Sequence, residues 1–83
     1  MRTNITIVGV GNRVAGFSNK TQQAYDFTPL AFTFPDGRIA GERACTVNVS
    51  ADILGGIQPK IGDVYDAVLH QSNFQIYLDA ILQ

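Results

Sequence analysis

The chain has few residues of the types that catalyse reactions or ligate metal ions. Its single histidine is His70 and its single cysteine is Cys45. His70 has no carboxylate or cysteine at ligand spacing, so we expect a surface residue and no metal site. Cys45 alternates with Val47 and Val49, which is typical of a small buried side chain, and no local base could activate it. We therefore predict no catalytic residue, no cofactor and no small-molecule substrate, and so not an enzyme.

One glycine motif and three aspartates also have simpler structural explanations. The segment Gly9-Val10-Gly11-Asn12-Arg13-Val14 begins like a dinucleotide-binding loop, but it lacks the third glycine and no helix follows. A bend in a strand explains these glycines better. Asp36, Asp63 and Asp66 lie at or beside predicted turns, and no aspartate pair has the spacing of a calcium loop.

Aromatic and basic residues suggest a binding chemistry instead. Several rings fall near predicted hairpin ends or out of phase with the expected core, namely Phe17, Tyr25, Phe27, Phe74 and Tyr77. The basic candidates are Arg13, Lys20, Arg38 and Arg43. Exposed rings beside cations suit single-stranded nucleic acid, because each stacked base contributes about 1–3 kcal/mol while Arg and Lys contact phosphates. In the alternative that the sequence leaves open, Phe17, Tyr25 and Phe27 form a small core beneath the first hairpin.

Hydrophobic residues alternate over short runs, and this period of two predicts strands. We expect strands over residues 3–14, 24–34, 43–49, 64–70 and 74–81. In the first strand the apolar positions change from odd numbers, Ile5 and Ile7, to even numbers beside Gly9 and Gly11. This change of phase predicts a bulge, and it predicts that Val8, Val10 and Val14 point inward. In the second strand the phase changes at Pro29, which predicts an edge or a bulge there.

Turn residues separate the strands and predict a small barrel. Pro35-Asp36-Gly37-Arg38 is a strong turn signal, and Ser50 and Gly55 can cap one helical turn between the third and fourth strands. We therefore expect residues 1–83 to form one all-β domain. Five strands, a bend in the first strand and this short helix predict a small five-stranded barrel of the OB type. An SH3-like barrel is the nearest alternative.

Composition limits the partners that the chain can bind. The 83 residues carry six Lys and Arg against seven Asp and Glu, a net charge of -1. Phosphate contacts would therefore need a local basic cluster. One cysteine allows no internal disulfide, and residues 1–6 do not read as a secretion signal. No apolar run is long enough for a membrane helix, so we expect a cytoplasmic protein without a membrane partner.

The order of these parts resembles the filamentous-phage single-stranded-DNA-binding proteins, which are small OB-fold homodimers. The resemblance covers most of the chain and lies in the first hairpin, residues 16–27, in the stretch over residues 57–68, and in a phenylalanine after the last turn. It implies a homodimer whose DNA contacts include Lys20, Tyr25, Phe27 and Phe74, with Arg13 as a basic residue at the end of the first strand. Asn19, Gln22 and Gln23 stand where the family would have further basic residues.

These observations predict a protein that binds single-stranded DNA, or RNA, without sequence preference. The expected nucleic-acid-binding residues are Arg13, Lys20, Tyr25, Phe27, Arg43 and Phe74. The alternative is a β-barrel that binds protein, as an accessory or assembly subunit of a phage or mobile element. The near-neutral charge favours this alternative, and the edges of a barrel can also accept a strand from a partner.

Overall fold

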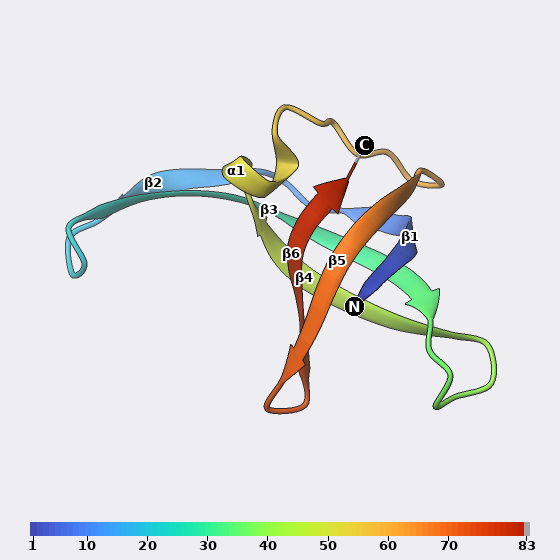
Figure 1. Cartoon of the computed structure of the whole chain (residues 1–83). Helices are drawn as coiled ribbons and strands as arrows, with labels where there is room; N and C mark the ends of the chain where they lie inside the picture. Colours follow the sequence, from blue (N-terminus) through green and yellow to red (C-terminus); the bar gives the residue numbers. More distant parts are fainter. Residues whose placement is uncertain (83) are drawn as a thin grey trace.

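The computed structural model describes residues 1–82, which form six β-strands and one short helix (Figure 1). In chain order the elements are β1 (Arg2–Val10), β2 (Val14–Ser18), β3 (Gln23–Pro35), β4 (Glu42–Ser50), α1 (Ala51–Leu54), β5 (Val64–Ser72) and β6 (Gln75–Leu82). The prediction of an all-β fold with one helical turn before the strand at residue 64 is confirmed.

Every strand pair is antiparallel, and β3 organises the sheet. One edge of β3 pairs with β2 near its start and with β1 near its end, and the other edge pairs with β4. β1 also pairs with β5, and β5 with β6. The sheet curls until β4 and β6 lie near each other, yet over residues 1–82 no ladder joins them. The sheet is therefore open, where the sequence predicted a five-stranded barrel.

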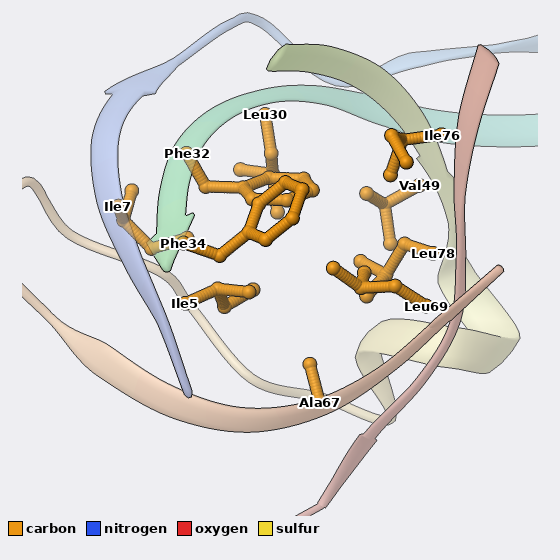
Figure 2. Packing of buried hydrophobic residues seen from close by; sticks show 10 residues of the cluster. All are labelled: Ile5, Ile7, Leu30, Phe32, Phe34, Val49, Ala67, Leu69, Ile76 and Leu78. Atoms are coloured by element: carbon orange, nitrogen blue, oxygen red, sulfur yellow. The ribbon is translucent and has the colours of Figure 1, made fainter. Parts of the chain in front are cut away.

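One hydrophobic core fills the inside of the curled sheet. Figure 2 shows its side chains pointing toward a common centre from strands on every side. Phe32 and Phe34 are fully buried, with ring centroids 6.1 Å apart. The other members are Ile5, Ile7, Leu30, Val49, Ala67, Leu69, Ile76 and Leu78. These residues alternate along their strands, which places their side chains on one face of the sheet.

The first predicted strand, residues 3–14, is interrupted. Its register with β3 shifts between Ile7 and Gly9, so the bulge predicted beside Gly9 is confirmed. The chain then leaves the sheet over residues 11–13, before β2 pairs with the start of β3. The expectation that three valines point inward is wrong, because the strand beyond the bulge runs past the core. Their exposed fractions are 49% for Val8, 41% for Val10 and 41% for Val14.

β3 keeps one alternation through Pro29, where a change of phase was predicted. Its register with β4 runs without a shift from Phe27 to Pro35, so there is no bulge. Pro29 lies just past the last pair with β1, and its carbonyl accepts from Gly11 N at 2.8 Å. The Pro29 nitrogen, which has no hydrogen to donate, therefore faces the gap between β1 and β2, where none of the described strands pairs with that edge of β3. With the even positions buried, Tyr25 and Phe27 belong to the outer face.

The predicted caps and turns are present. The Ser50 side chain accepts from Ile53 N, and Gly55 ends α1 in the left-handed conformation with φ 59°. After β3, the Asp36 carboxylate accepts from the backbone N–H of Arg38 at 3.0 Å. These local hydrogen bonds fix the direction in which the chain leaves β3 and β4.

Candidate nucleic-acid interface

The start of β3 and the whole of β2 form a hairpin that projects from the body of the sheet (Figure 1). The register pairs Gly16 with Tyr25 and Val14 with Phe27, and residues 19–22 join the two strands. Paired residues in an antiparallel ladder share a face. Tyr25 and Phe27 therefore lie on the same face of this hairpin.

The two rings are neighbours, and one is well exposed. The Tyr25 and Phe27 centroids lie 6.2 Å apart with an interplanar angle of 34°. Tyr25 is 43% exposed and Phe27 is half-buried, whereas Phe17 is 57% exposed and pairs with Ala24 on the opposite face. The three rings thus do not form a small core beneath the hairpin. The first two instead make an accessible aromatic surface.

Gly16 allows the Tyr25 side chain to cross β2. A Cβ atom at position 16 would lie 2.5 Å from the Tyr25 hydroxyl oxygen and 2.8 Å from Cζ. Any larger residue would push the ring away from the strand. The glycine therefore sets the position of the exposed ring.

The rings form one wall of a groove of about 600 Å³ between β3, β4 and α1. Because Phe27 pairs with Ser50, and Asn48 lies two residues before Ser50 on β4, these polar side chains share the outer face with the rings. The helix closes the far side. The full lining is Ala24, Tyr25, Asp26, Phe27, Asn48, Ser50, Ala51 and Asp52. This groove offers aromatic surface and a polar edge to a planar ligand.

Arg13, which was expected to contact phosphate, is bound to a carboxylate. Its Nε donates to Asp26 Oδ1 at 2.7 Å and its second guanidinium nitrogen donates to Oδ2. Hydrogen bonding to Arg13 lowers the pKa of Asp26, and the same bond raises the pKa of Arg13. Arg13 itself remains exposed. A phosphate must therefore compete with Asp26 for this guanidinium.

The other arginines are also paired with carboxylates, whereas in the described part of the chain the lysines are not. Arg2 pairs with Asp66, while Arg38 and Arg43 both pair with Asp36. Within residues 1–82, no carboxylate lies at ion-pair distance from either lysine. Lys20 lies in the loop that ends the projecting hairpin, where it is exposed. It is the cation on this hairpin that can meet a phosphate without breaking an ion pair.

Arg43 and Phe74 lie elsewhere on the fold. Arg43 is half-buried and pairs with Phe34, near the end of β3 that is remote from the hairpin, with Asp36 at 3.6 Å. Phe74 is 91% exposed in the turn between β5 and β6, which lies at a different end of the molecule from the loop of the β2–β3 hairpin (Figure 1). The structure thus places Tyr25 and Phe27 side by side, while Arg13 binds Asp26, whose side chain points to the opposite face of β3, and Arg43 and Phe74 lie elsewhere.

Some residues of this site were not predicted from sequence. Asn48, Ser50 and Asp52 line the groove, and Ser50 was recognised only as a helix cap. A register for the third predicted strand would have placed Ser50 beside Phe27, but alternation alone does not give the register of a strand that is not joined by a tight turn. Gly16 could have been identified from the hairpin turn, which fixes its pairing with Tyr25.

His70 has a carboxylate neighbour that sequence spacing did not reveal. Its Nδ1 lies 2.6 Å from Asp79 Oδ1, and its ring stacks on Tyr77 at 4.9 Å, because β5 and β6 pair. All three residues are exposed, as predicted for His70 and Tyr77. Cys45 is half-buried against the core, and burial raises the pKa of its thiol, which disfavours the nucleophilic thiolate.

The comparisons with known proteins identify no relative. No protein family, no curated protein and no solved structure matches the chain. Over residues 1–82 no cluster of His, Cys, Asp and Glu is suited to hold a metal ion. In the same part of the chain, no helix has the length and apolar character needed to cross a bilayer. The site must therefore be interpreted from its own geometry.

Proposed function

We propose that this protein binds single-stranded DNA of any sequence, without catalysing a reaction. The observation that carries the proposal is the exposed ring of Tyr25 beside Phe27, on the outer face of a projecting hairpin. Two adjacent rings on one accessible face form a contiguous apolar surface, which favours a binding role more than a single exposed ring does. Stacked bases would each contribute about 1–3 kcal/mol.

We assign the fold to the OB type. If β1 and β2 are counted as one interrupted strand, five strands remain, with α1 between the third and the fourth. The OB fold is a five-stranded, partly open Greek-key barrel, so the missing ladder between β4 and β6 is compatible with it. This assignment also supports the likeness to the phage single-stranded-DNA-binding proteins.

Phosphate contacts would come from Lys20 and Arg13. Both lie on or beside the hairpin that carries the rings, and Arg13 would exchange Asp26 for a phosphate oxygen. Two contacts predict a shallow salt dependence, with log K falling by about 1.4 per decade of salt for a single strand. We leave Arg43 and Phe74 out of the interface because they lie elsewhere on the fold.

We also propose that the protein acts as a homodimer, as the resemblance implies. One groove on a domain of this size covers few nucleotides, and a second copy would lengthen the binding surface. Neighbouring dimers on one strand would then bind cooperatively. Sedimentation of the free protein tests the dimer separately from DNA binding.

The direct test is a titration of fluorescein-labelled oligo-dT with the full chain at low salt. We expect saturable binding that weakens modestly as salt is added. No binding at tens of micromolar protein would overturn the proposal. Oligo-rU in the same assay would show whether the site distinguishes DNA from RNA.

The unpaired strand edges favour a second candidate function, which is binding of a protein partner. Within residues 1–82, β4 pairs only with β3, and β6 pairs only with β5, so each presents an edge of free backbone groups. A strand from a partner protein could add to either edge. Absence of oligo-dT binding, together with backbone amide protection of β4 or β6 by a partner, would favour this function.

A further inference from the structure

The groove beside Tyr25 and Phe27 carries an acidic edge and no basic residue. Its polar lining consists of Asp26, Asn48, Ser50 and Asp52. Asp26 is occupied by Arg13. Over residues 1–82, no hydrogen bond uses the Asp52 carboxylate or the Asn48 amide as a partner. The groove thus contains one exposed carboxylate and one exposed amide whose hydrogen-bonding capacity is unused.

This charge distribution determines which part of a nucleotide can enter. A phosphate would be repelled by Asp52, and the lining offers it no cation. A base is planar and can lie against the Tyr25 and Phe27 rings while its edge reaches the polar wall. An ionised carboxylate only accepts hydrogen bonds, so it favours a base edge that donates.

We infer that this groove is a subsite that prefers guanine among the bases of a single strand; the inference rests on the proposed function. Guanine presents two adjacent donors, N1–H and the N2 amine, which match the two oxygens of a carboxylate such as Asp52. Its O6 can accept from the Asn48 amide or from the Ser50 hydroxyl, whose oxygen already accepts from Ile53 N. Thymine has one N3–H between two carbonyl oxygens, which the carboxylate repels.

The test compares labelled strands that differ only at two positions. A 12-nucleotide oligo-dT is titrated beside the same strand with two isolated dT replaced by dG, and beside a third strand with inosine at those positions. We expect the dG strand to bind about 5- to 20-fold tighter than oligo-dT. Inosine lacks the N2 amine and should lose most of that gain.

The variant Asp52→Asn identifies the residue responsible. We expect the preference for dG over dT to disappear, because an asparagine amide cannot accept from both donors of guanine. Glu42→Gln is the matched control: it removes an exposed carboxylate from β4 outside the groove, and should keep the preference.

The outcomes separate the two proposals. Equal binding of all three strands overturns the guanine subsite and leaves the proposed function standing. A preference that survives in Asp52→Asn overturns the assignment to this groove. No binding of any strand overturns the proposed function and the subsite together.

Discussion

The Arg13 guanidinium donates to both carboxylate oxygens of Asp26, where the β2–β3 hairpin leaves the sheet. The pair joins the segment between β1 and β2 to the strand that carries Tyr25 and Phe27. It also neutralises the charge of Arg13. In the free protein, Asp26 therefore limits the attraction of Arg13 for phosphate.

Asp26→Asn should strengthen binding of oligo-dT, since a neutral amide holds Arg13 less tightly than a carboxylate. We expect affinity to rise about 3- to 10-fold at low salt. The dependence of log K on log salt should change little, because Arg13 contacts a phosphate in both proteins.

Asp66→Asn is the matched control for this prediction. It removes the same charge from a similar ion pair, with Arg2, on β1 and β5. An equal gain in both variants would mean that net charge, and not release of Arg13, is responsible. Weaker binding in Asp26→Asn would show that the ion pair positions Arg13 for its ligand.

Tyr25→Ala should weaken binding of oligo-dT about 5- to 100-fold, because it removes one stacking platform. Fluorescence anisotropy at fixed low salt measures the change. Tyr77→Ala removes a tyrosine of similar exposure, 41% against 43%, from another hairpin, and should leave affinity unchanged. Similar losses in both variants would contradict the assignment of the interface to the β2–β3 hairpin. Both variants should fold, since neither ring belongs to the core.

The sequence predicts the strands and the helical turn of this fold better than it predicts which strands pair with each other. Alternation places Ile5, Ile7, Phe32 and Phe34 inside because a buried face requires an apolar residue at every second position. Caps and turns are local, so Ser50 and Gly55 are recognisable from their neighbours alone. The open seam between β4 and β6 depends on how far the sheet curls, and no local pattern encodes that.

The wrong predictions for the side chains of β1, β2 and β3 share one cause, which is that every apolar residue of a strand was expected to point inward. Val10 and Val14 are exposed although they continue an apolar alternation. The apparent change of phase at Pro29 arises because Tyr25 and Phe27 occupy the outer face while Leu30 begins the buried set. Sequence alone cannot separate an exposed aromatic from a buried one when the strand extends beyond the core.

Phe74→Gly should stabilise the protein. The turn between β5 and β6 consists of Asn73 and Phe74 at φ 51° and 66°, the conformation of a type I′ turn, which favours Asn-Gly. A phenylalanine in this region costs about 1–2 kcal/mol, and a side chain that is 91% exposed offsets little of it. We expect a net gain of about 1 kcal/mol, or a Tm higher by about 4–8 °C.

Asn73→Gly is the control for the turn and should change Tm little, because asparagine tolerates the left-handed region. A lower Tm in Phe74→Gly would show that the ring makes contacts that outweigh its backbone strain. Binding of short oligo-dT should be unchanged in Phe74→Gly, since this turn and the loop of the β2–β3 hairpin lie at different ends of the molecule (Figure 1).

The last prediction concerns pH and the turn after β3. The Asp36 carboxylate accepts from the side chain and the backbone N–H of Arg38, and Arg43 lies 3.6 Å away. These partners hold the pKa of Asp36 at about 2, below its ordinary 3.8. A folded-state pKa below the unfolded value stabilises the fold above about pH 4, and this stabilisation is lost as pH falls toward 2. Urea unfolding at several pH values should therefore show stability declining across this window.

Asp36→Asn tests how much of that decline belongs to this turn. Asp26 and Asp66 also have lowered pKa values and are present in both proteins, so they affect both curves alike. We expect the variant to be less stable at neutral pH and its curve to be flatter between pH 4 and pH 2. Parallel curves would mean that Asp36 has the same pKa in the folded and unfolded chains, and that its contacts with Arg38 and Arg43 do not stabilise the fold through its charge.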